Sequence, residues 1–125
     1  MAVEAYDFEV TIPAGTLQAA PITVPLTMPP RIVRAIEIVV PDGWLGFAGF
    51  RIGAAGQPIL PRNTGAWIIT NDEVIRWPLT QAIDSGAWEA FGYNTGQYPH
   101  TLHVRFLVDL VASATVTTYP QPVQV

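Results

Sequence analysis

Hydrophobic and polar residues alternate along most of this chain, which is the pattern of a β-strand with one buried face. The clearest example is the segment 101–111, in which the even positions from Leu102 to Leu110 are all apolar. His103 and Arg105 lie between them and therefore point to the opposite face. We expect this segment to form a half-buried strand.

The same period of two predicts strands in the segments 6–12 and 22–28, and the segment 31–40 is a further expected strand with two largely apolar faces. Between turn sequences, strands are also expected in the segments 44–52, 57–60, 67–70, 74–77 and 88–93. Turn sequences separate most of them, such as Pro41-Asp42-Gly43 and Asn71-Asp72-Glu73, and the second of these is expected to close a hairpin. Pro25 lacks a backbone N–H, so its strand should lie at a sheet edge or form an extended arm. Residues 79–85 are expected to form one helical turn, with Thr80 as its cap.

Short strands about ten residues apart, joined by turns rich in Gly and Pro, are typical of an antiparallel β-sandwich or a jelly roll. A chain of 125 residues is long enough for one such domain. We therefore expect an all-β protein with one β-sandwich domain over residues 1–111, which includes the N-terminal strand and a proline-rich arm. Residues 112–125 carry no charge and are expected to form an extended C-terminal tail.

Charged residues are scarce: they make up 13% of the chain, whereas an average soluble domain has roughly 25%. Hydrophobic residues make up 50%, so some apolar surface is expected to face another protein. All six basic residues are arginines, which suit ordered ion pairs at interfaces. The net charge of −4 argues against a nucleic-acid partner, which would require clustered cations. Prolines interrupt the uncharged stretch 10–30, which argues against a membrane span and a membrane partner.

The residue types that carry catalysis or hold metal ions are few and dispersed. There is no cysteine, and neither of the two serines lies in a nucleophile elbow. His100 and His103 are three positions apart on a strand, so they face opposite sides and cannot share a metal ion. Glu37, Glu89 and Asp109 lie on expected strands near arginines, which favours ion pairs over an acid–base pair. The turn acids lack the ligand spacing of a calcium loop. We expect no catalytic residue, no metal site, no cofactor and no enzymatic activity.

The two ends of the chain are the candidate assembly surface. Prolines separate apolar residues in the N-terminal third, and the C-terminal tail is uncharged. Peripheral segments are usually polar, so we expect these two to dock at least in part on a neighbouring subunit. Proline lowers the entropy cost of ordering such an arm, because it restricts the free chain. The residues assigned to this interface are Ile22, Val24, Leu26, Met28, Arg31, Arg34, Val116, Tyr119 and Val123.

An alternative site is a platform of aromatic side chains that stack on a sugar. Its candidate residues are Trp44, Trp67, Trp77, Trp88, Tyr93 and Tyr98. The tryptophans, however, lie at expected strand ends beside Gly or Pro, where large rings often fill the end of a sandwich core. This placement favours a role in the core or in an interface over sugar stacking.

The chain resembles a known group of proteins in the stretches Ile12-Pro13-Ala14-Gly15-Thr16, Trp67-Ile68-Ile69-Thr70-Asn71-Asp72-Glu73, Ser85-Gly86-Ala87-Trp88 and Tyr93-Asn94-Thr95-Gly96. In them it is similar to the small, lysine-free β-sandwich proteins, rich in Gly, Pro and Trp, that tailed phages of actinobacteria encode among their structural genes. The resemblance implies a virion component, either a head decoration or a minor capsid protein. The resemblance assigns no functional residue to this chain.

From this resemblance and the scarcity of charge, we expect a non-enzymatic structural protein located in the virion. Such a protein would bind the phage capsid surface, with the major capsid protein or other virion subunits as partners. It would stabilise the shell through apolar and Arg-mediated contacts, and we expect it to be a homo-oligomer, a trimer or a dimer. The alternative function is a carbohydrate- or receptor-binding β-sandwich module of a phage tail or fibre.

Overall fold

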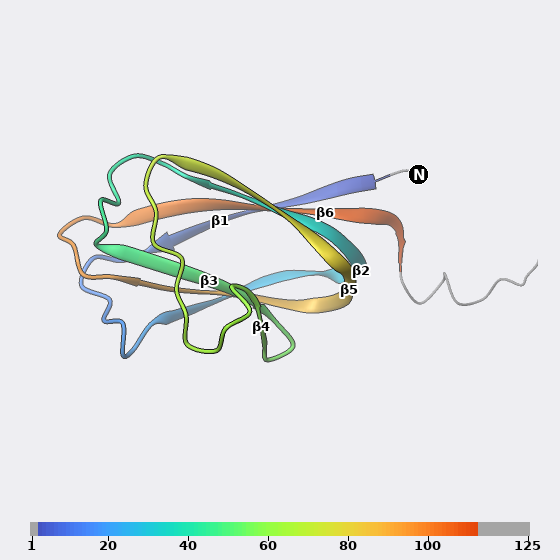
Figure 1. Ribbon diagram of the computed structural model, residues 1–125, viewed down its shortest axis with the longest axis horizontal. Helices are drawn as coiled ribbons and strands as arrows, with labels where there is room; N and C mark the ends of the chain where they lie inside the picture. Colours follow the sequence, from blue (N-terminus) through green and yellow to red (C-terminus); the bar gives the residue numbers. More distant parts are fainter. Residues whose placement is uncertain (1–2, 113–125) are drawn as a thin grey trace, which may run out of the picture.

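The computed structural model describes residues 3–112, which form an antiparallel sheet (Figure 1). Its strands are β1 (Val3–Ile12), β2 (Ile22–Val40), β3 (Ala48–Ala54), β4 (Gln57–Leu60), β5 (Glu73–Asn94) and β6 (His100–Ala112). They lie in the order β1-β6-β2-β5-β3-β4. The described residues include no helix, and hence none of the length and apolar character needed to cross a membrane. The predicted all-β, antiparallel class is confirmed.

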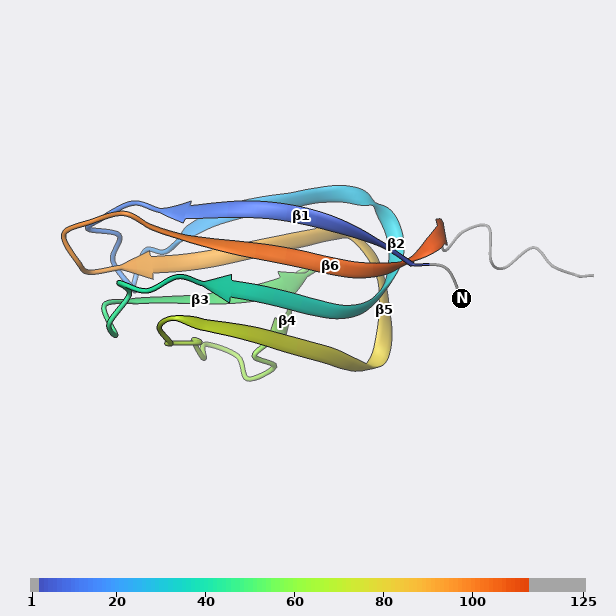
Figure 2. The same cartoon turned by 90° about the horizontal axis from the view of Figure 1, so that it is seen from above.

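The single sheet folds over itself into two layers, because β2 and β5 are long enough to belong to both. The first half of β2, from Ile22 to Thr27, pairs with the second half of β5. The second half of β2 pairs with the first half of β5 on one side and with β6 on the other. Figure 2 shows the two strands curving together from one layer into the other. The first layer therefore holds β4, β3 and one half each of β5 and β2, and the second holds β1, β6 and the remaining halves. This is the architecture of a β-sandwich.

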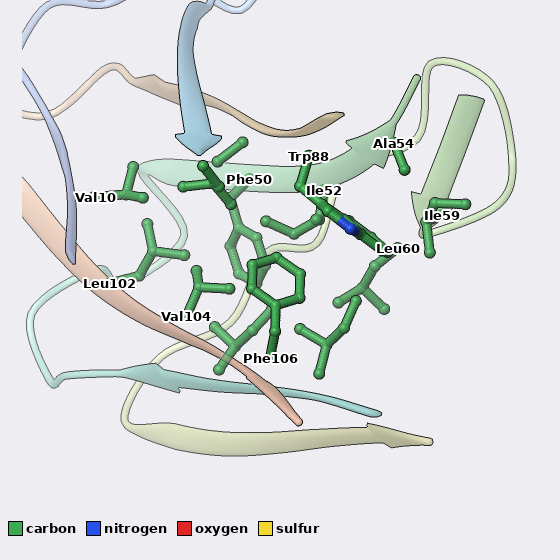
Figure 3. Close-up of a cluster of buried hydrophobic side chains, with 14 of the residues drawn as sticks. Val10, Phe50, Ile52, Ala54, Ile59, Leu60, Trp88, Leu102, Val104 and Phe106 are labelled. Carbon is green, nitrogen blue, oxygen red and sulfur yellow. The ribbon is translucent and has the colours of Figure 1, made fainter. Parts of the chain in front are cut away.

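The core lies between the two layers, where alternate residues of each strand point inward (Figure 3). Aromatic side chains join the layers at its centre: the Trp88 ring from β5 packs 4.8 Å from the Phe106 ring of β6, measured between centroids. Trp44 closes one end of the core with its edge against Phe50, at 6.0 Å. All four side chains are almost fully buried. Burial of such residues is the main stabilising term of the fold.

Two predicted breaks in the strands are wrong. The segment 79–85 is not a helical turn. It is part of β5, because residues of this segment pair with β2 where the two strands bend from one layer into the other. Pro29-Pro30 does not end a strand either, since β2 continues through it with a shift of register between Thr27 and Arg31. Such irregularities bend a strand without ending it. Here they produce the fold of the sheet.

The segment before β5 also differs from the prediction. Residues 67–70 were expected to form a hairpin with 74–77, but in this segment only Ile68 makes a bridge, and its partner is Phe50 of β3. The strand predicted over 44–52 begins at Ala48. The strand predicted over 57–60 is present as β4, which pairs with β3, and the edge position of Pro25 is confirmed, because in the described chain the first half of β2 pairs only with β5.

Candidate functional site

Loops gather at one end of the sandwich, at the left of Figure 1. They connect β1 to β2 (residues 13–21), β2 to β3 (41–47) and β5 to β6 (95–99). Backbone hydrogen bonds join them: the amide of Thr95 donates to the carbonyl of Phe47 over 2.9 Å, and the amide of Asn94 donates to Thr16 over 2.9 Å. The loops therefore form one connected surface.

The side chain of Asn94 is a buried anchor of this end. It is 0% exposed, and its Nδ2 donates to the carbonyl oxygens of Ile12 and Tyr98 over 3.2 and 2.7 Å. Its Oδ1 accepts from the amide of Gly96 over 2.9 Å. Every polar atom of the amide group thus has a partner, as burial requires. The bonds tie the end of β1 to the loop between β5 and β6.

Asn71 fixes the loop between β2 and β3 in a similar way. Its Oδ1 accepts from the backbone amides of Gly43, Trp44 and Leu45 over 2.9, 2.8 and 3.2 Å. Its Nδ2 donates to the Asp42 carboxylate over 2.9 Å. These bonds hold Leu45 at a φ of +47°, a left-handed conformation that a branched side chain rarely adopts.

Large apolar side chains stand out from these loops into solvent. We call them the loop-end surface: Leu17 is 63% exposed, Leu45 67%, Phe47 53% and Tyr98 72%. Each comes from one of the hydrogen-bonded loops described above. Large exposed apolar groups on rigid loops are typical of a protein-interaction surface.

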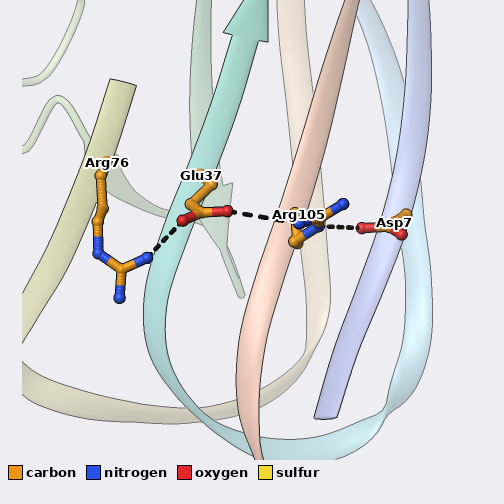
Figure 4. Close-up of polar contacts among 4 residues, drawn as sticks. All are labelled: Asp7, Glu37, Arg76 and Arg105. Atoms are coloured by element: carbon orange, nitrogen blue, oxygen red, sulfur yellow. Dashed lines mark hydrogen bonds and ion pairs between the residues drawn. The ribbon is translucent and has the colours of Figure 1, made fainter. Parts of the chain in front are cut away.

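The outer face of the second layer carries a row of alternating charges across four strands (Figure 4). Arg76 of β5 pairs with Glu37 of β2, whose other oxygen lies 3.7 Å from a guanidinium nitrogen of Arg105 on β6. The Arg105 Nε donates to Asp7 of β1 over 2.7 Å, and this bond is the main cause of the raised pKa of Arg105. The exposed pairs each contribute little to stability. They do neutralise this face.

Asp109 is the most buried of the charged side chains that form ion pairs in the described part of the chain. Its two oxygens accept from Nε and Nη2 of Arg34 over 3.0 and 2.8 Å, while only 6% of Asp109 is exposed. The hydrogen bonds from Arg34 lower the pKa of Asp109, and burial opposes this effect only in part. The predicted ion pairing of Glu37 and Asp109 is confirmed, but that of Glu89 is wrong, because its carboxylate makes no ion pair with a described residue.

The predicted assembly residues lie in different environments. Leu26 and Met28 are in the chain's own core, so their side chains are not available to a partner, and this part of the prediction is wrong. Their alternation with exposed residues reflects burial between the layers of one chain. Ile22 and Val24 are half-buried and pack against the same core.

The arginines of the predicted interface are paired within the chain. Arg31 donates to Glu4 over 3.1 Å, and Arg34 binds Asp109. Val116, Tyr119 and Val123 lie outside the described residues, so their role in assembly stays a prediction.

The predicted sugar platform is not assembled in this fold. Trp44, Trp88 and Tyr93 are buried, because they fill the core or lie beneath a loop, and they cannot stack on a ligand. Trp67 is half-buried with its edge against Tyr93, and Arg51 covers its ring. Trp77 and Tyr98 remain 39% and 72% exposed, but one belongs to β5 and the other to a loop.

The histidines point to opposite faces, as the alternation predicted. The His100 ring packs 5.6 Å from the Trp44 ring, and His103 is exposed with its Nδ1 3.9 Å from Glu9. Over the described part of the chain, no three side chains of His, Asp or Glu come close enough together to hold a metal ion.

No family model matches this chain, and no curated protein matches it in sequence. A chain from the capsid asymmetric unit of cyanophage Pam1 is similar in structure, with a TM-score of 0.57 and 15% identity. The match covers 84% of this chain and 82% of that one. A YbjQ-like protein of unknown function from Sulfolobus solfataricus P2 has a TM-score of 0.37 and 10% identity over 86% of this chain and 100% of its own, too low to carry an argument. The first likeness is one of fold, and it does not favour phages of actinobacteria over other phages.

Sequence reasoning missed the loop-end surface, because it placed the interface at the ends of the chain. A signal was present. Leu45 and Phe47 alternate with Gly46 and follow the turn Pro41-Asp42-Gly43, where connecting residues are usually polar. They lie within the strand predicted over 44–52, but in the structure this strand begins only at Ala48.

Proposed function

We propose that this chain is a non-enzymatic structural protein of a phage virion, which binds the capsid as a decoration or minor capsid subunit. The observation that carries the proposal is the fold shared with a chain of the cyanophage Pam1 capsid unit over most of both chains. The scarcity of charge supports it, because a surface with few charges suits permanent contact with other subunits.

The loop-end surface is the part of the described chain best suited to that contact. Its apolar side chains are exposed, while the loops beneath them are fixed by Asn71 and Asn94. A rigid surface loses little conformational entropy on binding. The left-handed Leu45 supports the same role, because a strained and exposed leucine adds nothing evident to the stability of its own chain.

The Arg-mediated contacts of the proposal have fewer candidates than the sequence suggested. Four arginines pair with carboxylates of the same chain: Arg31, Arg34, Arg76 and Arg105. This leaves Arg51 and Arg62 as the described arginines without such a pair. Contacts with a partner would therefore rest on apolar groups and on these two cations.

The partners we propose are the major capsid protein or other virion subunits, and the location is the virion. The trimeric or dimeric state stays a prediction, which a native mass measurement of the purified protein would decide. Whether the protein belongs to the head or to the tail of the virion would follow from which virion component it binds.

The test is co-fractionation with particles. Phage particles from cells that express the tagged chain are separated on a density gradient, and the proposal expects the chain in the particle band at a fixed ratio to the capsid protein. Immunogold labelling should then place it on the shell. A chain that stays at the top of the gradient, with no label on particles, would contradict the proposal.

A further inference from the structure

Arg51 of β3 has no acidic partner. Neither its guanidinium nor that of Arg62 makes a hydrogen bond or ion pair with any described residue. Arg62 is exposed to water on a loop, but Arg51 is half-buried. A half-buried cation has lost part of its hydration, and an acceptor would restore it.

Two aromatic rings fix the position of this cation. The central carbon of the Arg51 guanidinium lies 4.2 Å from the centroid of the Trp67 ring and 5.0 Å from that of Phe91. Such cation–π contacts use the flat face of the guanidinium. Its N–H donors lie at the edge of the group and remain available to an acceptor. The cation is thus held in place before any ligand binds.

Arg51 lines a pocket of about 160 Å³ on the outer face of the first layer, together with Gln57, Thr64 and Glu89. In the sheet, Arg51 pairs with Phe91, and Glu89 is two residues away from Phe91 on the same face. The Glu89 carboxylate forms no ion pair with Arg51 and no hydrogen bond with another described residue. One pocket therefore holds an unpaired cation and an unpaired anion.

We propose that this pocket binds an acidic side chain of another protein chain. The carboxylate accepts hydrogen bonds from the edge of the Arg51 guanidinium, and Glu89 accepts a backbone N–H from the same peptide segment. A bare anion would be repelled by Glu89, whereas a peptide brings a donor with its carboxylate. The inference rests on the proposed function only in the identity of the other chain, which would be a virion subunit.

An acidic sugar shares the carboxylate, but the structure favours a peptide. Sugars bind by stacking on an exposed aromatic face, and here Arg51 lies over both Trp67 and Phe91. The four arginines that are paired within the described chain all bind Asp or Glu carboxylates. The pocket therefore suits a charge contact better than a stacking contact.

The test uses N-acetyl-aspartate N-methylamide as the probe and the neutral asparagine analogue as its matched control. Binding is followed by NMR through the backbone amides of Gly53, Gly56 and Gly65, which line the pocket. We expect the aspartate probe to bind about tenfold more tightly than the asparagine probe, the difference of one charge-assisted contact. Arg51→Met, which preserves the length of the side chain, should remove this preference. Arg62→Met should leave it unchanged.

A second measurement needs no variant. Raising the salt concentration from about 0.02 to 0.5 M should weaken the aspartate probe several-fold, because screening acts on the charge contact. Any of four results would overturn the inference: equal binding of both probes, a preference that survives Arg51→Met, no effect of salt, or tighter binding of glucuronate than of the aspartate probe.

Particle co-fractionation separates the two proposals: if the wild type binds particles but not the aspartate probe, the pocket inference alone fails. If the wild type binds the probe but no particles, the proposed function alone fails.

Discussion

Two polar side chains, Asn94 and Asp109, are buried in the part of the chain that the structure describes. Every polar atom of the Asn94 amide and of the Asp109 carboxylate has a hydrogen-bond partner. Asn94 joins the loops at one end of the sandwich, while Asp109 neutralises Arg34 at the outer face of β6. A buried polar group that loses its partner costs more than the bond itself was worth, because it has also lost water. Single substitutions at these positions therefore test how the fold is held.

Asn94→Ala should destabilise the protein by roughly 2–4 kcal/mol, because it leaves the carbonyls of Ile12 and Tyr98 and the amide of Gly96 without partners. Urea denaturation followed by tryptophan fluorescence measures the change. Asn63→Ala, at an exposed loop position, is the matched control and should stay within about 0.5 kcal/mol of the wild type. A similar loss of stability in both variants would show that the hydrogen bonds of Asn94 do not stabilise the fold.

The Arg34–Asp109 ion pair predicts that the stability of the fold falls at acidic pH. The pKa of Asp109 is lowered in the folded protein from its ordinary 3.8, so the unfolded chain binds more protons as the pH falls. The stabilising effect is complete above that value and is lost as the pH falls through the folded pKa. We expect Asp109→Asn to be less stable at neutral pH and to lose less stability between about pH 4 and pH 2.

Thermal unfolding across this pH range measures the effect. Glu9→Gln removes an exposed carboxylate from the same face and should reproduce the wild-type curve. Parallel curves for the wild type and Asp109→Asn would mean that this pair does not set the acid limit of the fold.

At the scale of elements, the bend shared by β2 and β5 makes a sandwich from one sheet. Gly86 lies at this bend, and a Cβ there would meet the carbonyl oxygen of Met28 at 2.8 Å and the nitrogen of Pro30 at 3.1 Å. These are backbone atoms, which cannot move aside as a side chain can. Gly86→Ala should therefore cost about 2 kcal/mol or more, by the usual penalty of overpacking. Ala55→Gly, at a turn with a φ of +50°, is the control and should be neutral or slightly stabilising in the same denaturation experiment.

The bend also explains which elements the sequence could predict. Alternation alone located most of β1 and β6, because each lies in one layer with one face in the core. It failed for β2 and β5, where Pro29-Pro30 and residues 79–85 carry the local signals of a break. Pairing between two distant segments overrides those signals, and a single sequence does not show that pairing. The loop-end surface was missed for a related reason: Leu45 and Phe47 share the period of a strand but stand in a loop.

At the scale of the whole molecule, the paired charges and the loop-end surface lie on different parts of the sandwich. The outer face of the second layer carries the paired charges together with the exposed Val39 and Val74, and the loop end exposes apolar side chains. Charged groups that pair with each other offer little to a partner, whereas exposed apolar groups gain by being covered. A subunit built in this way would approach a shell with its loops and leave its charged face toward solvent. Contact through the loop end should therefore be separable from stability.

The double substitution Leu45→Asn and Phe47→Ser tests that separation. Asparagine tolerates the left-handed conformation at position 45 better than leucine does, so the fold should keep its stability within about 0.5 kcal/mol or gain slightly. The particle-bound fraction on a density gradient should fall at least tenfold, because two exposed anchors of the proposed contact are lost. Val39→Ser with Val74→Ser, an exposed apolar pair on the charged face, is the matched control and should bind particles like the wild type. If the control variant loses binding while the loop-end variant keeps it, the chain docks through its sheet face, and the loop end serves another purpose.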